Sequence, residues 1–507
     1  MHTCHGVHAL TFSANARGKM HHLPSFPANM IPTQRAIFVC LILCCTFSTS
    51  VCAQPLESGG GREATTNKAA PIPLPPPSAS ARELFSRYKS RLVQVRVLLN
   101  SANEQSSLGS GFVVRDDGPN GVWLVTNYHV VSSLAINPEK FRLELRPTSE
   151  RAVKATLVAV DVIHDLAVLR TEPLTGAAAW PAFDLRDSAP AQGERIFSLG
   201  NPLELGFLIS EGIYNGLVES RIYEQMLFSG ALNSGMSGGP AIDEYGRVVG
   251  VNVATRRGGQ LLAFLVPVRY ARELLERAWR VPPRKEWRTE IGRQLLAHQR
   301  FVSGKLLNMA GMDAVESVGE KKGQNTHDNS TVATAKAGFA SQTLAGRTVP
   351  TLDGSLTKCW AGGRDGERLR YERDTLDCSL RSELFVRGNL YTGYLSVRHV
   401  LLRNDKLATP QFLSIGSSSR SPTSFVAGNG EMTAHECRDD YVKGAMHVYR
   451  VAICLTAFRK FEGIYNFSVN ATQVDDPRER MLSSLSLHGV SFDNGQRLSR
   501  MFLERLQ

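Results

Sequence analysis

A glycine-rich turn around a serine is the first stretch of this chain that suggests covalent chemistry. Ser237 lies in "NSGMSGGP", with glycines at Gly235, Gly238 and Gly239. A serine becomes a nucleophile when a base takes its proton, a carboxylate orients that base, and backbone N–H groups stabilise the developing oxyanion. Glycines permit the tight turn in which the N–H groups of Gly235 and Ser237 converge. The turn alone is not specific, so the base and the carboxylate must be found elsewhere.

Both missing groups occur upstream of the serine. Between residues 81 and 280 the chain has only two histidines, His129 and His164. His129 follows the apolar run "GVWLVTNY", and Asp165 follows His164 and opens "DLAVLR". Alone, either residue is more often a packed histidine or a turn carboxylate. In the order His129, Asp165, Ser237 they predict a catalytic triad in which His129 is the general base, Asp165 orients it and Ser237 attacks.

The elements that must position these residues are short strands. Apolar and β-branched runs recur from residue 81 to residue 280, among them "VQVRVLL", "GSGFVV", "FRLELRP", "KATLVAVD", "RIFSLG" and "GRVVGVNVA". Glycine turns separate them, which is typical of an all-β barrel or sandwich. Few helices are expected, and two of them are predicted at the ends, in "RELFSRYKSRL" and "RYARELLERAW".

Residues 108 to 268 resemble the trypsin-like serine proteases of the HtrA (Deg) group. The matching stretches are "LGSGFVV", "LVTNYHVV", "HDLAVLR", "SLGNPLELGFLISEGIYNGL", "NSGMSGGPAIDEYGRVVGVNVA" and "AFLVP". The resemblance implies a mainly β chain with a chymotrypsin-like double β-barrel and an active site between the barrels. It implies the same triad, an oxyanion hole formed by the N–H groups of Gly235 and Ser237, and polypeptide substrates. We expect no cofactor and no metal.

The chain departs from the family pattern in two places. The residue before the nucleophile, commonly Asn in the HtrA group, is Met236, whose side chain need not face the scissile bond. After residue 280 we find no glycine-led peptide-binding loop of the PDZ domain that many members carry.

Substrate contacts follow from the resemblance. In the chymotrypsin fold the residue six before the nucleophile lies at the base of the primary specificity pocket, and here it is the uncharged Ala231. This disfavours a demand for Lys or Arg and favours a small or medium apolar side chain. The stretch Val251, Asn252 and Val253 is expected to pair with an extended substrate by β-augmentation.

The N-terminal region predicts export. The apolar run "IFVCLILCCTF", residues 37 to 47, follows Arg35 and precedes the small residues Val51 and Ala53. It is shorter than the ~20 residues of a membrane span and fits a signal peptide, with Met30 as a second candidate start. We expect a protein of the bacterial periplasm or a secreted protein, with no stable membrane span after cleavage. A retained anchor is the alternative.

Four cysteines lie beyond this region, at Cys359, Cys378, Cys437 and Cys454. An even number in an exported chain predicts two disulfides with three connectivities, of which we favour the sequence-local pairs Cys359–Cys378 and Cys437–Cys454. A zinc site is the alternative, but the ligand spacing is poor.

Composition divides the chain into six segments. They are a signal region (1–53), a Pro/Gly/Ser-rich linker (54–80), the protease domain (81–280), a helix and mobile linker (281–344), a β-rich domain of unknown type (345–475) and a partly helical tail (476–507).

The formal net charge is +11, yet no Lys/Arg cluster is interleaved with aromatics, so a nucleic-acid partner is disfavoured.

Two functions remain open. The first function is an exported serine endopeptidase acting on misfolded or exposed protein segments. The second is a protease-fold binding protein, inactive or switched off, that acts through its C-terminal module. The complete triad favours the first, and the sequence leaves oligomerisation open.

Overall fold

The computed structural model describes most of the chain from residue 79 onward. The described residues are 79–147, 152–173, 180–219, 221–255, 261–280, 286–306, 338–352, 354, 357–364, 370–380, 383–415, 430–444 and 446–506. The predicted signal region and all but the last two residues of the predicted 54–80 linker lie outside them. Among the described helices, none has the length and apolar character needed to cross a membrane.

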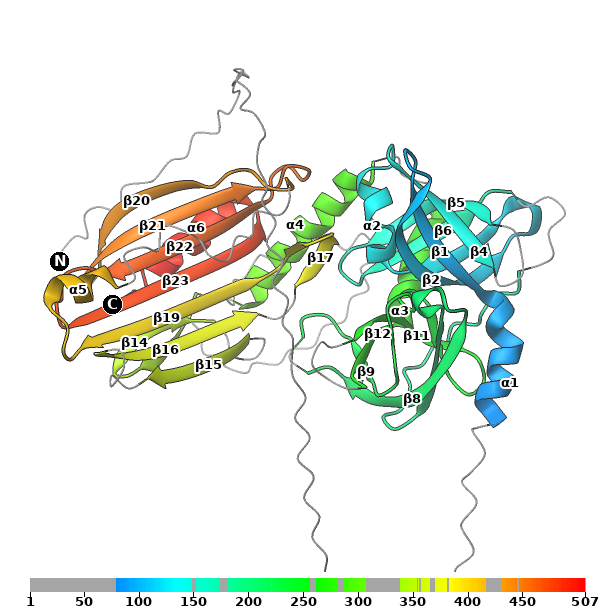
Figure 1. Cartoon of the computed structure of the whole chain (residues 1–507), viewed down its shortest axis with the longest axis horizontal. Helices are drawn as coiled ribbons and strands as arrows, with labels where there is room; N and C mark the ends of the chain where they lie inside the picture. Colours follow the sequence, from blue (N-terminus) through cyan, green and yellow to red (C-terminus); the bar gives the residue numbers. More distant parts are fainter. Residues whose placement is uncertain are drawn as a thin grey trace, which may run out of the picture. The chain divides into compact units, whose positions relative to one another are not determined.

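Two closed six-stranded barrels follow one another along the chain, with strand orders β1-β2-β3-β6-β5-β4 and β10-β11-β12-β9-β8-β7 (Figure 1). The first barrel contains β1 (Leu92–Leu99), β2 (Glu104–Asp116), β3 (Val122–Thr126), β4 (Phe141–Pro147), β5 (Val153–Asp161) and β6 (Leu166–Thr171). The second contains β7 (Arg195–Gly200), β8 (Leu208–Leu217), β9 (Met226–Phe228), β10 (Pro240–Ile242), β11 (Val248–Thr255) and β12 (Ala263–Pro267). The predicted double barrel is confirmed.

Apolar runs explain why these strands close on themselves. In β3 every residue is buried, and the interior of the first barrel is filled by valine and leucine side chains from several strands, such as Val95, Leu124 and Leu169. Closure leaves no strand edge exposed along a barrel and buries the inward-facing positions. The loops at the strand ends are therefore held by a rigid frame.

Helices cover the barrels and continue into the rest of the chain. α1 (Ala79–Tyr88) precedes β1, α2 (Tyr128–Ile136) follows β3, and α3 (Val268–Arg280) follows β12. α3 buries Ala271, Leu274 and Leu275 at helical spacing, as its sequence predicts. α4 (Trp287–Leu306) then forms within the segment predicted as helix and linker.

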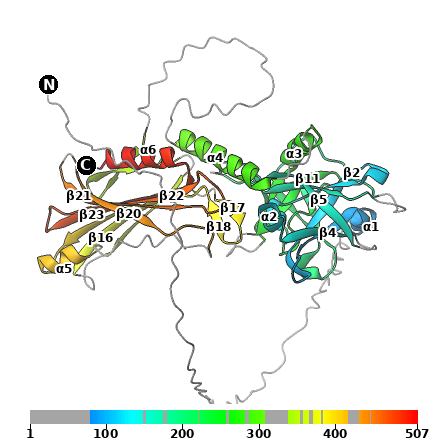
Figure 2. The ribbon, with the colours of Figure 1, turned by 90° about the horizontal axis from the view of Figure 1, so that it is seen from above.

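The C-terminal part is a seven-stranded antiparallel sheet of order β15-β16-β19-β23-β22-β21-β20. Its strands are β15 (Thr357–Arg364), β16 (Tyr371–Leu380), β19 (Leu395–Asn404), β20 (Glu436–Lys443), β21 (Val448–Ala457), β22 (Tyr465–Gln473) and β23 (Glu479–Val490). Two hairpins accompany it, β13 (Ala340–Leu344) with β14 (Arg347–Thr351) and β17 (Leu384–Arg387) with β18 (Leu390–Thr392). The short helix α5 is Thr409–Ser414, and α6 (Phe492–Leu503) lies along one face of the sheet (Figure 2).

The predicted boundaries of this domain do not match the sheet. β23 belongs to the segment predicted as a tail, yet it is a central strand between β19 and β22. Its buried Met481, Leu485 and Leu487 alternate with half-buried residues, so the pattern of a strand is present there. β13 likewise begins inside the predicted linker. The domain therefore extends on both sides of 345–475.

Both favoured disulfides are present, and each joins two directly paired residues of neighbouring strands. Cys359 pairs with Cys378 across β15 and β16, and Cys437 pairs with Cys454 across β20 and β21. Since β15 and β20 are the two edge strands, each disulfide ties an edge strand to its inner neighbour.

A buried histidine makes this sheet sensitive to acid. His399 is fully buried, with one ring nitrogen 2.8 Å from Ser483 Oγ and the other 2.7 Å from the carbonyl oxygen of Pro350. Burial lowers the pKa of His399 to about 4 from its ordinary value of 6.5, although the Pro350 carbonyl opposes that shift. Between these values the unfolded chain binds the proton more readily, so the stability that the neutral histidine confers is lost as the pH falls from 6.5 towards 4.

We therefore expect the melting temperature to fall between pH 6.5 and pH 4, and to fall less steeply in His399→Gln. The reason is that glutamine has no proton to gain over this range. Thermal denaturation followed by circular dichroism from pH 4 to pH 8 measures both slopes. Identical slopes for the two proteins would contradict this assignment.

Candidate active site

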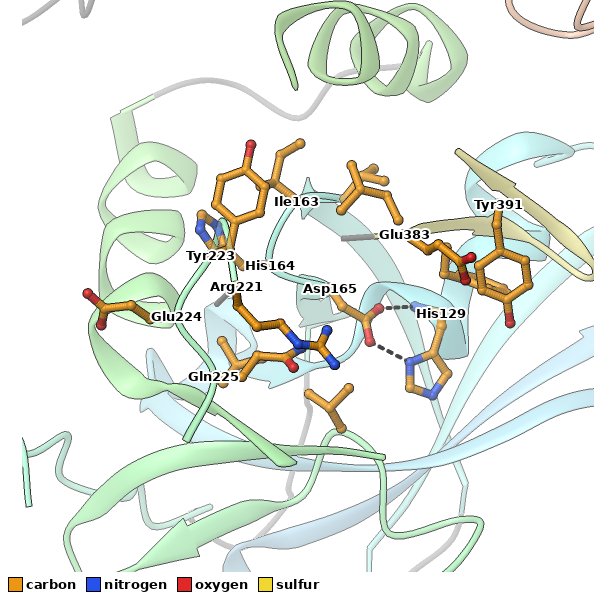
Figure 3. A pocket seen from close by; sticks show the side chains of 15 residues that line it. His129, Ile163, His164, Asp165, Arg221, Tyr223, Glu224, Gln225, Glu383 and Tyr391 are labelled. Carbon is orange, nitrogen blue, oxygen red and sulfur yellow. Dashed lines mark hydrogen bonds and ion pairs between the residues drawn. The ribbon is translucent and has the colours of Figure 1, made fainter. Parts of the chain in front are cut away.

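A pocket of about 390 Å³ contains the two upstream members of the predicted triad (Figure 3). His129 and Asp165 lie on its wall, with Ile163 from the loop between β5 and β6 and Val253 from β11. The pocket therefore draws its walls from both barrels. Its volume is in the range of sites that hold a small ligand or a few side chains of a peptide.

Asp165 holds both the ring and the backbone of His129. Its Oδ2 lies 2.7 Å from His129 Nδ1, and its Oδ1 accepts the backbone N–H of His129 at 2.8 Å (Figure 3). The pair is partly shielded, with side chains 30% and 20% exposed. With Nδ1–H donating to the carboxylate, Nε2 is the nitrogen left to accept a proton.

The backbone of Asp165 is strained and is held by two hydrogen bonds. Its φ of 55° lies in the left-handed region, which is uncommon for residues other than glycine. Its carbonyl accepts the N–H of Tyr128 at 3.1 Å and the side-chain Nδ2 of Asn127 at 2.8 Å. The start of α2 and the β5–β6 loop are thereby locked together, and the carboxylate faces His129.

The environment makes His129 a stronger base. Burial disfavours its charged form, but the negative charge of Asp165 and the hydrogen bond that His129 donates to it outweigh that effect and raise the pKa of His129 above its ordinary value of 6.5. A raised pKa suits a group that takes a proton at near-neutral pH.

Ser237 is bonded to a residue of the same pocket wall rather than to this pair. Its Oγ donates to the carbonyl oxygen of Val253 at 2.8 Å, and Val253 lines the same pocket as His129. Among the described residues the Ser237 hydroxyl makes no hydrogen bond to His129. The structure thus joins His129 and Asp165 directly, and it links Ser237 to their pocket only through the bond to Val253.

Glycine is required in the turn that carries Ser237. Gly238 has a φ of 85°, and a Cβ there would lie 2.3 Å from both the Ser110 carbonyl oxygen and Thr126 Oγ1. Gly235 has a φ of 94° and is buried. A larger residue at Gly238 would meet atoms of the first barrel, and one at Gly235 would have to adopt a strained backbone conformation.

Ser110 of β2 connects this turn to the first barrel. Its N–H donates to the carbonyl of Ser237 at 2.8 Å, and its Oγ donates to the carbonyl of Gly235 at 2.7 Å. The same Oγ accepts the N–H of Asn201 at 2.9 Å, and Ser110 is fully buried. One residue of the first barrel thus fixes the turn that carries Ser237 in the second.

The predicted oxyanion donors have no acceptor within the described part of the protein. The N–H groups of Gly235 and Ser237 donate to no protein atom there, whereas the neighbouring N–H of Met236 donates to Asn233. The Met236 side chain is buried with Met226 in the apolar interior of the second barrel. The side chain at this position, where the chain departs from the family pattern, therefore lies in the barrel interior and not in the pocket.

The predicted substrate contacts are only partly placed at the pocket. Val251 and Asn252 are buried, and their backbones pair with strands of the barrel, so we correct their assignment as substrate-binding residues. Asn252 instead supports the turn that carries Ser237. Its Nδ2 donates to the carbonyl of Met236 at 3.3 Å and to that of Leu199 at 2.9 Å. Val253 lines the pocket, and Ala231 is exposed outside its lining.

The second histidine of the domain has a different role. His164 lies 3.0 Å from Asp161 through Nδ1 and Oδ2, and its ring stacks on Tyr270 at 3.7 Å. Asp161 also pairs with Arg277 of α3. Among the described residues, no cluster of three or more His, Cys, Asp or Glu side chains is arranged for a metal ion.

Sequence reasoning missed two groups of residues at this site. Ser110 lies within the quoted "GSGFVV", but nothing in that stretch indicates a bond to residues more than 100 positions later. The β17–β18 hairpin, which also lines the pocket through Phe385 and Tyr391, belongs to the C-terminal domain. Its alternating "ELFVRGNLYT" predicts a hairpin but not its destination.

The Ser110 bridge gives a test of how the two barrels are joined. Ser110→Ala leaves the Gly235 carbonyl and the Asn201 N–H buried without their partner, so we expect a loss of about 2 kcal/mol in the free energy of unfolding. Ser106→Ala, at an exposed position of the same strand, should change it by less than about 0.5 kcal/mol. Urea denaturation measures both. Equal stability of the two variants would show that the hydroxyl contributes nothing.

Comparison with known proteins agrees with this geometry. Residues 109–251 match the trypsin-like peptidase domain. The chain is 30% identical over 240 residues to mitochondrial serine protease HTRA2 of Bos taurus, covering 43% of this chain and 48% of that protein. It is 31% identical over 183 residues to a probable periplasmic DegP-like serine endoprotease of Halomonas elongata, covering 34% and 36%.

A crystal structure of Deg5 is 26% identical with a TM-score of 0.34, covering 39% of this chain and 94% of that one. The chain spans less than half the length of the two relatives named above. The two barrels, with their pocket and the turn at Ser237, match the trypsin-like peptidase domain over residues 109–251 and are similar to HtrA-type serine proteases.

Proposed function

We propose that this protein is a serine endopeptidase that hydrolyses peptide bonds through Ser237, His129 and Asp165. The observation that carries the proposal is the bond between His129 Nδ1 and Asp165 Oδ2, which leaves Nε2 as the basic nitrogen. His129 and Val253 both line the pocket. Ser237 adjoins the same pocket through its bond to Val253. The similarity to HtrA-type serine proteases agrees with this assignment of roles.

The reaction starts with a rotation of the serine side chain. The Ser237 hydroxyl leaves the Val253 carbonyl and donates to His129 Nε2. As Oγ attacks the scissile carbonyl carbon, its proton passes to Nε2, and Asp165 stabilises the imidazolium that forms. The oxyanion accepts hydrogen bonds from the N–H groups of Gly235 and Ser237.

Collapse of this intermediate completes the first half of the reaction. The C–N bond breaks, His129 gives its proton to the leaving amine, and an ester of Ser237 remains. Water then attacks the ester with His129 again as base, which releases the acid and restores the serine. Every proton is returned, so the cycle needs neither a cofactor nor a metal.

Export and substrate class belong to the same proposal. A DegP-like relative is described as probably periplasmic, and two disulfides fit an oxidising compartment. We infer that the enzyme acts in the periplasm or outside the cell on misfolded or exposed segments of polypeptides.

A second candidate function rests on the hydrogen bond of Ser237 to Val253. If this arrangement persists in solution, the hydroxyl is held off the base, and the domain serves as a binding scaffold together with the C-terminal sheet. Labelling by a fluorophosphonate separates the two candidates, because only an activated serine reacts readily.

Hydrolysis of fluorescently labelled, unfolded casein provides the direct test. Ser237→Ala should lower kcat/KM at least about a thousandfold because the nucleophile is lost. The matched control Ser234→Ala removes an exposed serine of the same loop and should leave most of the activity.

The pH dependence of the same reaction gives a second prediction. Only the neutral form of His129 is a base, so the acid limb of kcat/KM should lie above pH 6.5, as its raised pKa requires. Equal activity of Ser237→Ala and Ser234→Ala, or an acid limb below pH 6.5, would contradict the proposal.

A further inference from the structure

The β17–β18 hairpin leaves the C-terminal domain and packs on the helix that carries His129. Leu384, Val386 and Leu390 are buried in the same apolar cluster as Tyr128 and other side chains of the first barrel. The Tyr128 hydroxyl donates to the carbonyl of Val386 at 2.8 Å in a buried hydrogen bond. The contact thus has an apolar core and a satisfied polar group, as stable interfaces do.

An ion pair of Arg387, beside the turn of the hairpin, connects the hairpin to neighbouring residues. Arg387 lies 3.0 Å from Glu431, which also pairs with Lys460 at 3.4 Å. Lys460 in turn donates to Asn137 Oδ1 at the end of α2, at 3.3 Å. The hairpin and α2 therefore share one network, and the hairpin is not a freely moving loop.

Helix α4 supports the pocket from the other side. The side chain of Gln294 accepts the N–H of Val162 at 2.8 Å and donates to the carbonyl of Val160 at 2.9 Å. Val162 lines the pocket. Further along α4, Gln299 accepts a hydrogen bond from Asn494 of α6, so the same helix also binds the C-terminal domain.

The hairpin supplies part of the pocket wall. The ring of Phe385 lies edge-on to His129 with centroids 6.1 Å apart, and Tyr391 lies edge-on to Phe385 at 5.5 Å. Tyr391 is 47% exposed, and Glu383 beside it is exposed as well (Figure 3). These side chains present an aromatic surface beside the proposed general base.

The remaining walls have a mostly apolar lining. Val162, Ile163, Val253 and Val266 contribute aliphatic side chains, and Tyr223 adds another ring. Of the charged groups at the pocket, Glu224 is paired with Arg269, and the Arg221 guanidinium lies close to the ring of Phe264. The chemistry of the lining fits a large apolar side chain.

We propose that the hairpin is a substrate-specificity element, in which Phe385 and Tyr391 bind an apolar side chain of an extended polypeptide close to the bond that is cut. This rests on the proposed peptidase function and names the substrate feature it selects. Large apolar side chains are mostly buried in folded proteins, so such a pocket favours unfolded segments. The C-terminal domain is thereby a part of the active site.

Binding measured without catalysis tests the proposal. The probe is a fluorescein-labelled, eight-residue alanine-rich peptide that carries one Phe, compared with the same peptide carrying Ser, and both are titrated onto the full-length Ser237→Ala protein. We expect the Phe peptide to bind at least about tenfold more tightly than the Ser peptide. Adding Tyr391→Ala or Phe385→Ala should reduce that preference to about threefold or less.

The matched control is Tyr441→Ala, which removes an exposed tyrosine of β20 in the same domain and should keep the full preference. Thermal denaturation checks that each variant folds, and Tyr391→Ala is the safer variant because Tyr391 is half exposed. No preference for Phe in Ser237→Ala, or a preference that Tyr391→Ala leaves unchanged in a folded protein, would overturn the proposal.

The two proposals fail in different ways. A wild-type protein that cleaves no polypeptide, together with a Phe preference that depends on Tyr391, would reject the peptidase function and leave the pocket as a binding site for apolar segments. A protein that cleaves casein but has no Tyr391-dependent preference would keep the peptidase function and reject the role of the hairpin.

Discussion

The hydrogen bonds of one buried serine hold the two barrels together at the proposed active site. Ser110 belongs to the first barrel, yet its N–H and hydroxyl bind the carbonyls of Ser237 and Gly235 in the second. The proposed base and its carboxylate come from one barrel and the proposed nucleophile from the other, so the proposed chemistry depends on the contact between the two. A single fixed serine at that contact leaves the Ser237 turn little freedom.

Hydrogen bonds also fix Asp165, the proposed partner of His129. Asp165 adopts a left-handed backbone conformation that only its surroundings make stable, because Asn127 and Tyr128 bind its carbonyl. Its carboxylate then binds both the ring and the N–H of His129. Backbone strain at a functional position is thus balanced by hydrogen bonds from the neighbouring helix. That helix is in turn covered by the hairpin of the C-terminal domain, through Tyr128 and Val386.

Much of this could be predicted from the sequence, because the informative signals are local. Glycines around Ser237, a histidine after an apolar strand and an aspartate before another need only a few neighbouring residues to be recognised. The disulfide pairing could also be predicted, because Cys359 and Cys378, and likewise Cys437 and Cys454, lie opposite each other on strands that are neighbours in sequence. The barrels followed from regular strand spacing and from the resemblance to the HtrA group.

What could not be predicted depends on long-range packing. Val251 and Asn252 were predicted to pair with an extended substrate, but their backbone groups pair with the neighbouring strands of the barrel. Of the three predicted residues only Val253, where the pairing of β11 with β12 shifts register, lines the pocket. β23 lies in the segment predicted as a tail; its alternating pattern is that of a strand, but the pattern does not indicate that it pairs between β19 and β22. Nothing near Phe385 indicates that it will meet His129, more than 250 residues earlier.

The proposed catalysis requires the Ser237 hydroxyl to turn from Val253 to His129. The most direct measurement is a crystal structure of the full-length protein after reaction with diisopropyl fluorophosphate. We predict a phosphoryl group on Ser237 Oγ, one of its oxygens bound by the N–H groups of Gly235 and Ser237, and His129 still paired with Asp165. An unmodified Ser237 whose hydroxyl still donates to Val253, in protein with both disulfides formed, would contradict the account.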